Sequence, residues 1–405
     1  MNSGNLFNYL FQMALGRSLT PADFGGFNAL NSTMVIFAAP LAIVPLVMAR
    51  FTARFSLQGE TRGMGQIKAL LVTALKWSCV AAAVAYALGC LLIPFLKSFL
   101  HIETNLPILL MFGVMALSFI LPVPWGMLQG LQRFLGYGLA GASNAFFRFL
   151  TVFVWVGFLG FGVNGALLCS ISGSLAAIGV NLLFLKDVLP HKAEPLPGGL
   201  AKEVGTYSAG MLVSSVIVMA LGNLDLILVR HYCSAEGAGL YATGAILGRI
   251  AFYLPSVLMS VLFTEAVTAK EAGETGHKSL WISVGMTALL GGGFALVCAL
   301  FSGFVVKILF GTQYVAAGPL LAVISGAMAL LSVANILFVY FQARSEFGFV
   351  WIQAAGVGLF LALTVFHHET PMTVAWLLFF CIAFILLGSF AWFFLRERRA
   401  SKPAA

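Results

Sequence analysis

Charged side chains are scarce in this sequence of 405 residues: 9% are Asp, Glu, Lys or Arg, whereas 60% are hydrophobic. Soluble globular domains carry roughly 25% charged residues, so this scarcity excludes a soluble protein. Apolar runs of about 20 residues, the length that crosses a bilayer as a helix, recur along the whole chain and leave no room for a sizeable soluble domain. The sequence therefore predicts an all-α integral membrane protein.

Cysteine is also rare, with six in the whole chain. All but one fall inside predicted membrane spans, and no CxxC spacing occurs, which argues against a disulfide framework and a zinc site. We expect these cysteines to be small buried apolar residues. The run from His367 to Glu369 comes nearest to a metal cluster, but its place in a tight outward turn favours solvated loop residues. We therefore expect no cofactor and no metal.

We expect about twelve membrane-spanning helices. The apolar runs cover residues 3–16, 27–49, 69–96, 107–128, 138–161, 164–185, 205–229, 239–264, 279–305, 317–341, 349–366 and 371–395. The first run is short and carries Asn5, Asn8 and Gln12, so it either lies in part in a polar interior or lacks residues upstream. An even number of spans places both termini on the same side of the membrane.

The basic residues that give the net charge of +8 are distributed unevenly between the loops of the two sides. Most basic residues follow an even-numbered span: Arg50, Arg54, Arg62, Lys68, Arg133, Lys186, Lys192, Lys202, Lys270, Lys278, Arg344, Arg396, Arg398, Arg399 and Lys402. The loops after odd-numbered spans hold only Arg17, Lys97, Arg230 and Lys307. By the positive-inside rule we expect both termini in the cytoplasm, in a multi-pass protein of the cell inner membrane. This distribution explains the positive charge without a nucleic-acid partner.

A turn near the N-terminus is repeated in the second half of the chain. Gly25 and Phe27 match Gly239 and Tyr241 at an offset of 214 residues, within the stretches GRSLTPADFGGF and VRHYCSAEGAGLY. The stretches LQGLQRF and FQARSEF match in nearly the same phase, at an offset of 213. The matches indicate an internal duplication with six spans in each copy. We expect two six-helix lobes related by a pseudo-two-fold axis along the membrane normal.

A breaker-rich segment separates the two copies. It carries Pro190, Pro195, Pro197, Gly198 and Gly199, which is a composition typical of a linker. We therefore expect an N-terminal lobe in residues 1–187, a cytoplasmic linker in 188–204, a C-terminal lobe in 205–396 and a cytoplasmic tail in 397–405.

These features resemble a known transporter family. The twelve spans, the two lobes and the repeated turn, with the stretches GNLDLILVRHYCSAEGAGLYATG and ILFGTQYVAAGPLLAVIS, are similar to polysaccharide biosynthesis proteins of the oligosaccharide flippase type, in the multidrug/oligosaccharidyl-lipid/polysaccharide (MOP) exporter superfamily. The resemblance implies flipping of undecaprenyl-pyrophosphate-linked sugar units to the outer leaflet. It also implies a lipid-linked oligosaccharide substrate, contact with membrane lipids, and a polysaccharide polymerase and glycosyltransferases as partners.

Ionisable residues inside spans are expensive, at roughly 2.5–3.5 kcal/mol each at a helix centre, and so point to function. Four stand out: Lys76, Arg148, Asp225 and Arg249. By residue counting, Arg148 and Arg249 lie near the midplane of different lobes, and Asn144 and Thr151 share a helical face with Arg148. Either both arginines hold a pyrophosphate in a central cavity, or each is satisfied by backbone carbonyls or a neighbouring span.

Lys76 and Asp225 lie closer to the ends of their spans. Lys76 is a further candidate for binding an anionic substrate, although its long side chain could reach the cytoplasmic interface instead. Asp225 is a candidate site for a coupling ion, and a local ion pair with Arg230 or His231 is the alternative.

Three classes of function are open, and a lipid-linked oligosaccharide flippase that works by alternating access leads them. A multidrug or cation exporter of the same superfamily is the runner-up, since cationic substrates favour buried acids and most of the interior charges are basic. A membrane polymerase, ligase or glycosyltransferase needs an acid, a base or a metal-binding acidic pair in a sizeable loop. The short outward loops contain no such pair, so we do not expect an enzyme.

Overall fold

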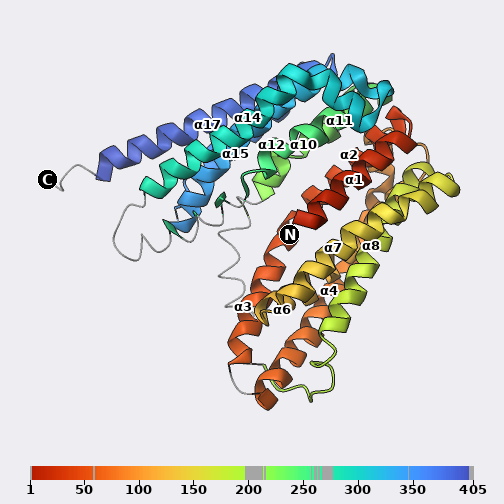
Figure 1. Ribbon diagram of the computed structural model, residues 1–405, viewed down its shortest axis with the longest axis vertical. Helices are drawn as coiled ribbons and strands as arrows, with labels where there is room; N and C mark the ends of the chain where they lie inside the picture. The colour runs from red at the N-terminus through yellow and green to blue at the C-terminus, as the bar shows by residue number, and fades with distance from the viewer. Residues whose placement is uncertain are drawn as a thin grey trace. The chain divides into compact units, whose positions relative to one another are not determined.

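The computed structural model describes residues 2–57, 60–196, 213, 216–256, 258–259, 262, 265–266, 277–344 and 346–400. The chain divides into two compact units, Met1–Leu212 and Val213–Ala405, which we call lobe 1 and lobe 2. The regular structure of the described residues is helical, with no strand among them (Figure 1). The all-helical, two-lobed fold expected from the sequence is confirmed.

Proline starts several helical segments of lobe 1. The elements are α1 (Asn2–Ser18), α2 (Pro21–Ala38), the 3-10 turn η1 (Ala39–Ile43), α3 (Val44–Ser56), α4 (Glu60–Phe99), α5 (Leu106–Ile120), α6 (Pro122–Gly130), α7 (Phe134–Leu150), the π-helical η2 (Phe153–Phe158) and α8 (Gly162–Phe184). Proline lacks an N–H group and is tolerated in the first helical turn, where that group has no partner. Pro45 and Pro122 stand in the first turns of α3 and α6, so the predicted second and fourth spans are each divided into shorter helices.

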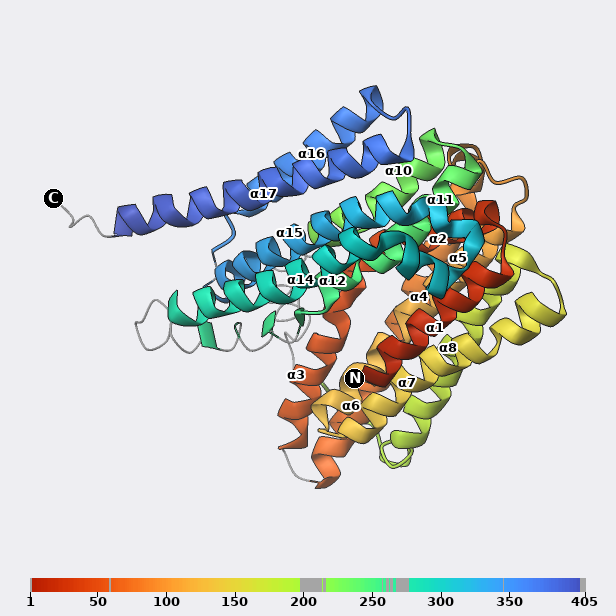
Figure 2. The same cartoon turned by 45° about the horizontal axis from the view of Figure 1, so that its top comes forward.

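Lobe 2 contains longer uninterrupted helices. Its described elements are α10 (Leu224–Tyr232), α11 (Ala235–Gly248), α12 (Ile250–Tyr253), α14 (His277–Phe310), the 3-10 turn η3 (Thr312–Ala317), α15 (Gly318–Ala343), α16 (Val350–Phe366) and α17 (Pro371–Ala400). Both views show α14, α15 and α17 side by side (Figures 1 and 2). Helix α15 is largely buried between its neighbours, which makes it the core helix of this lobe.

Eight helical segments of the described residues are long and apolar enough to cross a membrane. They cover Pro21–Ser56, Arg62–Phe99, Leu106–Gly130, Phe134–Phe158, Gly162–Phe184, His277–Phe310, Thr312–Ala343 and Pro371–Arg396. Helix α16 is a shorter apolar helix, and α1 corresponds to the short first span. The predicted spans 205–229 and 239–264 include residues outside the described part of the chain.

The two turns that the sequence aligns have the same local structure. Thr20 caps α2 by accepting a hydrogen bond from the Asp23 amide at 3.2 Å, and Ser234 caps α11 by accepting one from the Gly237 amide at 3.1 Å. Hydroxyl side chains at this position satisfy amides that the first helical turn leaves unpaired. Thr20 and Ser234 are 214 residues apart, the offset of the repeat.

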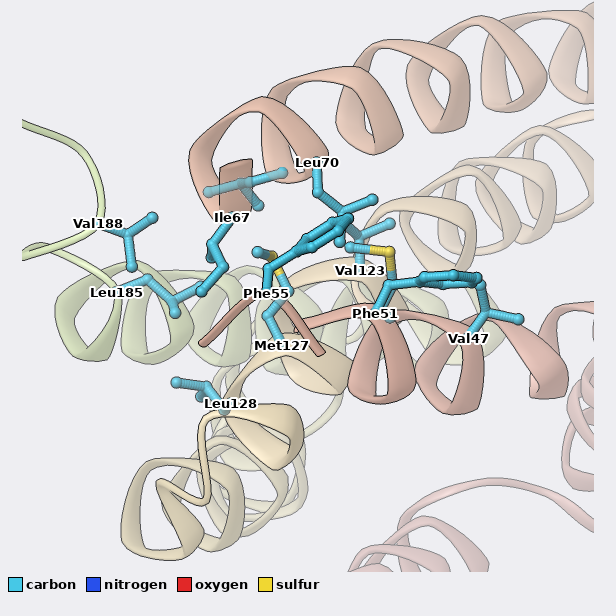
Figure 3. Close-up of a cluster of buried hydrophobic side chains, with 12 residues drawn as sticks. Val47, Phe51, Phe55, Ile67, Leu70, Val123, Met127, Leu128, Leu185 and Val188 are labelled. Atoms are coloured by element: carbon cyan, nitrogen blue, oxygen red, sulfur yellow. The ribbon is translucent and has the colours of Figure 1, made fainter. Parts of the chain in front are cut away.

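An apolar cluster closes one end of lobe 1. The cluster includes Phe51 and Phe55 of α3, Ile67 of α4, Met127 of α6 and Val188 after α8 (Figure 3). All five side chains are buried. The chain after α8 therefore begins as part of lobe 1, since Val188 lies in its core and Lys68 Nζ donates to the Leu189 carbonyl at 2.6 Å. The predicted linker beyond residue 196 lies outside the described residues.

Two glycines one turn apart bring α6 against α3. A Cβ at Gly126 would lie 2.4 Å from the Pro45 carbonyl oxygen, and one at Gly130 would lie 2.5 Å from the Ala49 carbonyl oxygen. Real Cβ atoms do not approach backbone this closely, so only glycine permits the contact. This is the close packing of small residues that membrane helices use in place of the hydrophobic effect.

We expect Gly126→Ala to lower the midpoint of thermal unfolding of the purified protein by several degrees, because α3 and α6 must separate at a cost of about 1–3 kcal/mol. Gly138→Ala on α7 is the matched control, since a Cβ there meets nothing within 4 Å. Alanine is the better helix former, so the control should be neutral or stabilising. Equal midpoints for the two variants would contradict the close contact.

An ion pair connects the turn before α7 with the end of α8. Arg133 donates to both carboxylate oxygens of Asp187 and to the Phe184 carbonyl. The hydrogen bond from Arg133 holds the pKa of Asp187 below its usual range. Asp187 is 46% exposed, so solvent screens the pair and its contribution is at most about 1 kcal/mol.

The stability that this pair provides should depend on pH in one direction. Because the folded-state pKa of Asp187 is depressed, the contribution is complete above the unfolded pKa of about 3.9 and is lost as the pH falls through the lower folded value. We expect Asp187→Asn to lower the unfolding midpoint at pH 6 and to lower it less near pH 2.5. An effect of equal size at both pH values would rule out this origin.

Candidate functional site

The polar face of α7 packs against α8 in lobe 1. Arg148 Nε donates to Ser170 Oγ at 3.1 Å, and Trp155 Nε1 on η2 donates to Ser172 Oγ at 3.3 Å. Each serine donates its own proton to the carbonyl four residues earlier on α8, which leaves its oxygen to accept. The predicted polar face thus lies against a polar seam of the neighbouring helix.

The Arg148 guanidinium also lies over an aromatic ring from α1. Its Cζ is 4.3 Å from the ring centroid of Phe11, a cation–π contact, and Phe11 is fully buried. Among the described residues, Ser170 is the one hydrogen-bond partner of the Arg148 side chain, and no acid forms an ion pair with it. Neither Nη nitrogen of Arg148 is among the fully buried polar atoms that lack a partner in the described residues, so both remain accessible. Arg148 therefore presents a positive charge and four N–H donors to an incoming anion.

Asn144 and Thr151 share this face but differ in their contacts. Thr151 Oγ1 donates to the Phe147 carbonyl at 2.7 Å, so its proton is used within α7. Asn144, one turn before Arg148, lines a pocket of lobe 1. A Cβ at Gly173 of α8 would lie 2.5 Å from the Asn144 carbonyl oxygen, so glycine lets the two helices come together here.

In lobe 2, Asp225 and Arg249 form a buried ion pair. Arg249 Nη2 lies 3.0 Å from Asp225 Oδ1, and the Tyr241 hydroxyl donates to Asp225 Oδ2 at 3.2 Å. The Asp225 side chain is fully buried and that of Arg249 is 14% exposed. Tyr241 and Arg249 are the side-chain partners of Asp225 among the described residues, in place of the alternative pair with Arg230 or His231. The expectation that Arg148 and Arg249 face one cavity stays a prediction.

The repeat offset relates some of the residues around these two sites. Phe11 and Asp225 are 214 residues apart, and so are Phe27 and Tyr241. In lobe 1 the rings of Phe11 and Phe27 meet edge to face with centroids 6.0 Å apart, whereas in lobe 2 the equivalent residues form a hydrogen bond. Positions 11 and 225 thus each contact an arginine, which comes from α7 in lobe 1 and from the end of α11 in lobe 2.

Lys76 lies apart from these groups. It is exposed on α4, on one stripe with Val72 and Val80, which are 53% and 46% exposed. An exposed apolar stripe is the face that a membrane helix turns toward lipid. Helix α4 has 40 residues and is therefore about 60 Å long, twice the roughly 30 Å hydrocarbon core. No contact of Arg148 involves Lys76, and this position favours the alternative in which the lysine reaches the interface.

Phe11, Ser170 and Tyr241 were not identified as site residues from the sequence. Each residue type is common in membrane helices, and only the neighbouring helix shows which of them meets a charge. Among the described residues, which include the run from His367 to Glu369, no group of three or more His, Cys, Asp and Glu could hold a metal ion. The charged groups of the site are therefore Arg148 and the pair of Asp225 with Arg249.

No family model matches the sequence, and no curated protein matches it. The fold is similar to those of solved MOP superfamily transporters. An inward-facing multidrug resistance transporter of the MATE family aligns with a TM-score of 0.81 at 13% identity, over 99% of this chain and 96% of its own. The lipid II flippase MurJ aligns with a TM-score of 0.70 at 9% identity, over 95% of this chain and 85% of its own.

A third structure, a MOP superfamily transporter from Pyrococcus furiosus, aligns with a TM-score of 0.65 at 15% identity, over 99% of this chain and 94% of its own. At these identities the likeness is one of fold. The chain is a multi-pass membrane protein with the fold of MOP superfamily transporters, and its structural neighbours are transporters and a flippase rather than enzymes.

We expect Asp225→Asn to destabilise lobe 2 by about 3–5 kcal/mol, because it leaves the Arg249 charge buried without its counter-ion. The double variant Asp225→Asn with Arg249→Gln removes both charges and should recover much of this loss. Glu369→Gln, at a site 68% exposed, is the control. Unfolding midpoints measure the difference, and a double variant no more stable than the single one would show that the pair is not the cause.

Proposed function

We propose that this protein is a flippase that moves polyprenyl-pyrophosphate-linked oligosaccharide units across the cytoplasmic membrane for surface polysaccharide synthesis. The observation that carries the proposal is the balance of buried charge. Asp225 is the one fully buried acid of the described residues, and Arg249 neutralises it. Arg148 has no such counter-ion, so the interior of the described spans carries an excess of positive charge that favours an anionic headgroup.

The geometry of Arg148 suits a phosphate. Two Nη nitrogens can donate in parallel to two phosphate oxygens, which is the strong bidentate form of this contact. Ser170 and Phe11 hold the remaining parts of the guanidinium, so little side-chain entropy is lost on binding. Asn144 and Thr151 flank the same face. Lys76 belongs to the substrate path only if the headgroup passes the exposed stripe of α4.

The ion pair of lobe 2 supplies a means of coupling. A cation that binds Asp225 competes with Arg249, and the released guanidinium is then available to the pyrophosphate. The headgroup and the coupling ion would in this way stabilise the same state, which is what linkage between two ligands requires. The polyprenyl tail stays in lipid through a lateral opening, the lobes alternate access, and no bond is made or broken.

A multidrug or cation exporter is the second candidate, and the likeness of fold supports it equally, since the structural neighbours include a MATE multidrug resistance transporter as well as a lipid II flippase. For the transporter from Pyrococcus furiosus, a reverse polarity of the binding pocket is described as suggesting a different function. The charge of the binding pocket is thus the property that distinguishes the flippase from the cation exporter. A polysaccharide polymerase and glycosyltransferases belong to the flippase proposal as partners, and a membrane-bound polymerase or ligase is the remaining alternative.

We expect Arg148→Lys to weaken binding of undecaprenyl pyrophosphate to the purified protein roughly tenfold, and Arg148→Ala to weaken it further, because hydrogen bonds to charged groups contribute about 1.5–3 kcal/mol. Surface glycan should fall in both variants while precursor accumulates in the inner leaflet. Arg50→Lys is the matched control, an exposed arginine whose Cζ lies 5.9 Å from the Phe51 ring.

Normal affinity and normal glycan export in both Arg148 variants would refute the proposal. Export of cationic drugs that depends on Asp225 and not on Arg148 would establish the second candidate in its place.

A further inference from the structure

A pocket of about 190 Å³ lies in lobe 1 and is lined by residues of helices α1, α6, α7 and α8. Its lining residues are Asn8, Leu121, Trp125, Ala140, Gly141, Asn144, Ala177 and Asn181. Asn181 is fully buried and Asn8 is exposed, so the pocket leads from the surface into the helix bundle. No charged side chain lines it.

The deepest polar group in this pocket is unsatisfied. Neither Oδ1 nor Nδ2 of Asn181 has a hydrogen-bond partner among the described residues. A buried amide without partners is costly, and such groups in proteins are normally bonded to water or to a ligand. The side chains of Asn8 and Asn144 likewise form no hydrogen bond with the described residues that could compete for a ligand. Three amides from three helices therefore converge on one space.

The chemistry of the walls selects an uncharged, hydroxyl-rich ring. Each amide offers two N–H donors and an accepting oxygen, which is the complement of hydroxyl groups that both donate and accept. Trp125 supplies an apolar wall whose orientation is fixed: its Nε1 donates to the Tyr137 carbonyl at 3.1 Å, and its ring stacks on that of Tyr137 at 5.2 Å. A sugar ring has one apolar C–H face for such a wall and hydroxyl groups for the amides.

The size sets an upper limit on the ligand. Water occupies about 30 Å³ per molecule, so the space holds roughly six waters, comparable with a single hexose ring. It is smaller than the roughly 300–1,000 Å³ of pockets for drug-sized ligands. Small residues make the room, because a Cβ at Gly141 would already lie 3.3 Å from the Trp125 ring.

We infer that this pocket is a binding site for one uncharged sugar ring, the one attached directly to the phosphate of the lipid-linked substrate. Asn144 precedes Arg148 by one helical turn, a rise of about 6 Å, so a ring against Asn144 places its phosphate beside the Arg148 guanidinium. The assignment to the first sugar rests on the proposed flippase function. The affinity of the pocket for a hexose ring does not depend on that function.

The test compares undecaprenyl pyrophosphate with the same lipid carrying one hexose, each titrated against the full-length protein in lipid nanodiscs. We expect Asn181→Leu to weaken binding of the glycosylated lipid about tenfold and to leave the sugar-free lipid unchanged, whereas Arg148→Ala weakens both. Asn164→Leu is the matched control, because Asn164 is also on α8 and its Oδ1 is also buried without a partner among the described residues, but it does not line the pocket.

A second variant shows whether a loss of binding comes from the pocket or from misfolding of the first variant. Gly141→Val fills the pocket from α7 toward Trp125 without removing an amide, and it should cause the same selective loss. If Asn181→Leu and Gly141→Val bind both lipids as the wild type does, or weaken both equally, the pocket holds water only and the inference is overturned.

A lipid-free measurement separates this inference from the flippase proposal. Methyl glucoside should quench tryptophan fluorescence of the wild-type protein at millimolar concentration, and Trp125→Phe or Gly141→Val should abolish the change. Quenching without binding of either lipid would keep the sugar site and reject the flippase. Absence of quenching together with equal affinities for the two lipids would reject the sugar site and leave the flippase proposal standing.

Discussion

The structure depends on one constraint: a polar group inside an apolar helix bundle must find a partner within the protein, because the surrounding lipid offers none. The helices satisfy the backbone, and the hydroxyl groups of Ser170, Ser172 and Thr364 donate to carbonyls of their own helices. Several buried polar side chains of the described residues still keep an atom without a partner, such as Gln66, Asn164 and Asn181. Arg148 and the pair of Asp225 with Arg249 are the charged groups whose burial has to be explained by contacts between helices or by a ligand.

The two lobes meet this constraint differently at equivalent positions. An aromatic ring at position 11 accepts the guanidinium face of Arg148, and a carboxylate at position 225 accepts the guanidinium edge of Arg249. The first contact leaves the charge of the arginine available and the second cancels it. The arginines themselves stand at positions that the repeat does not relate, on α7 in lobe 1 and at the end of α11 in lobe 2, so only the position that they contact is shared.

The sequence predicts the helices of this protein better than their contacts. Hydropathy locates the spans, and the spacing of Asn144 and Arg148 identifies a polar face, because both depend on neighbours along one helix. The partner of Asp225 is different: Arg249 is 24 residues away on another helix, and the nearby Arg230 is a natural but wrong choice. Asn181 stands alone in an apolar span, and its meaning depends on four helices that no local pattern relates. Inter-helix geometry therefore limits what can be deduced about the site.

The apolar cluster around Phe51 and Phe55 and the lipid-embedded helices of lobe 1 differ in what stabilises them. The cluster is flanked by Arg50, Arg54 and the ion pair of Arg133 with Asp187, charged groups that the positive-inside rule leads us to expect at the membrane surface. Along the spans, helix association gains little from expelling water, because lipid is as apolar as the side chains. At the cluster, burial removes hydrocarbon from water and carries the large heat capacity change of a soluble core. One end of the lobe should consequently loosen on cooling while the lipid-embedded part does not.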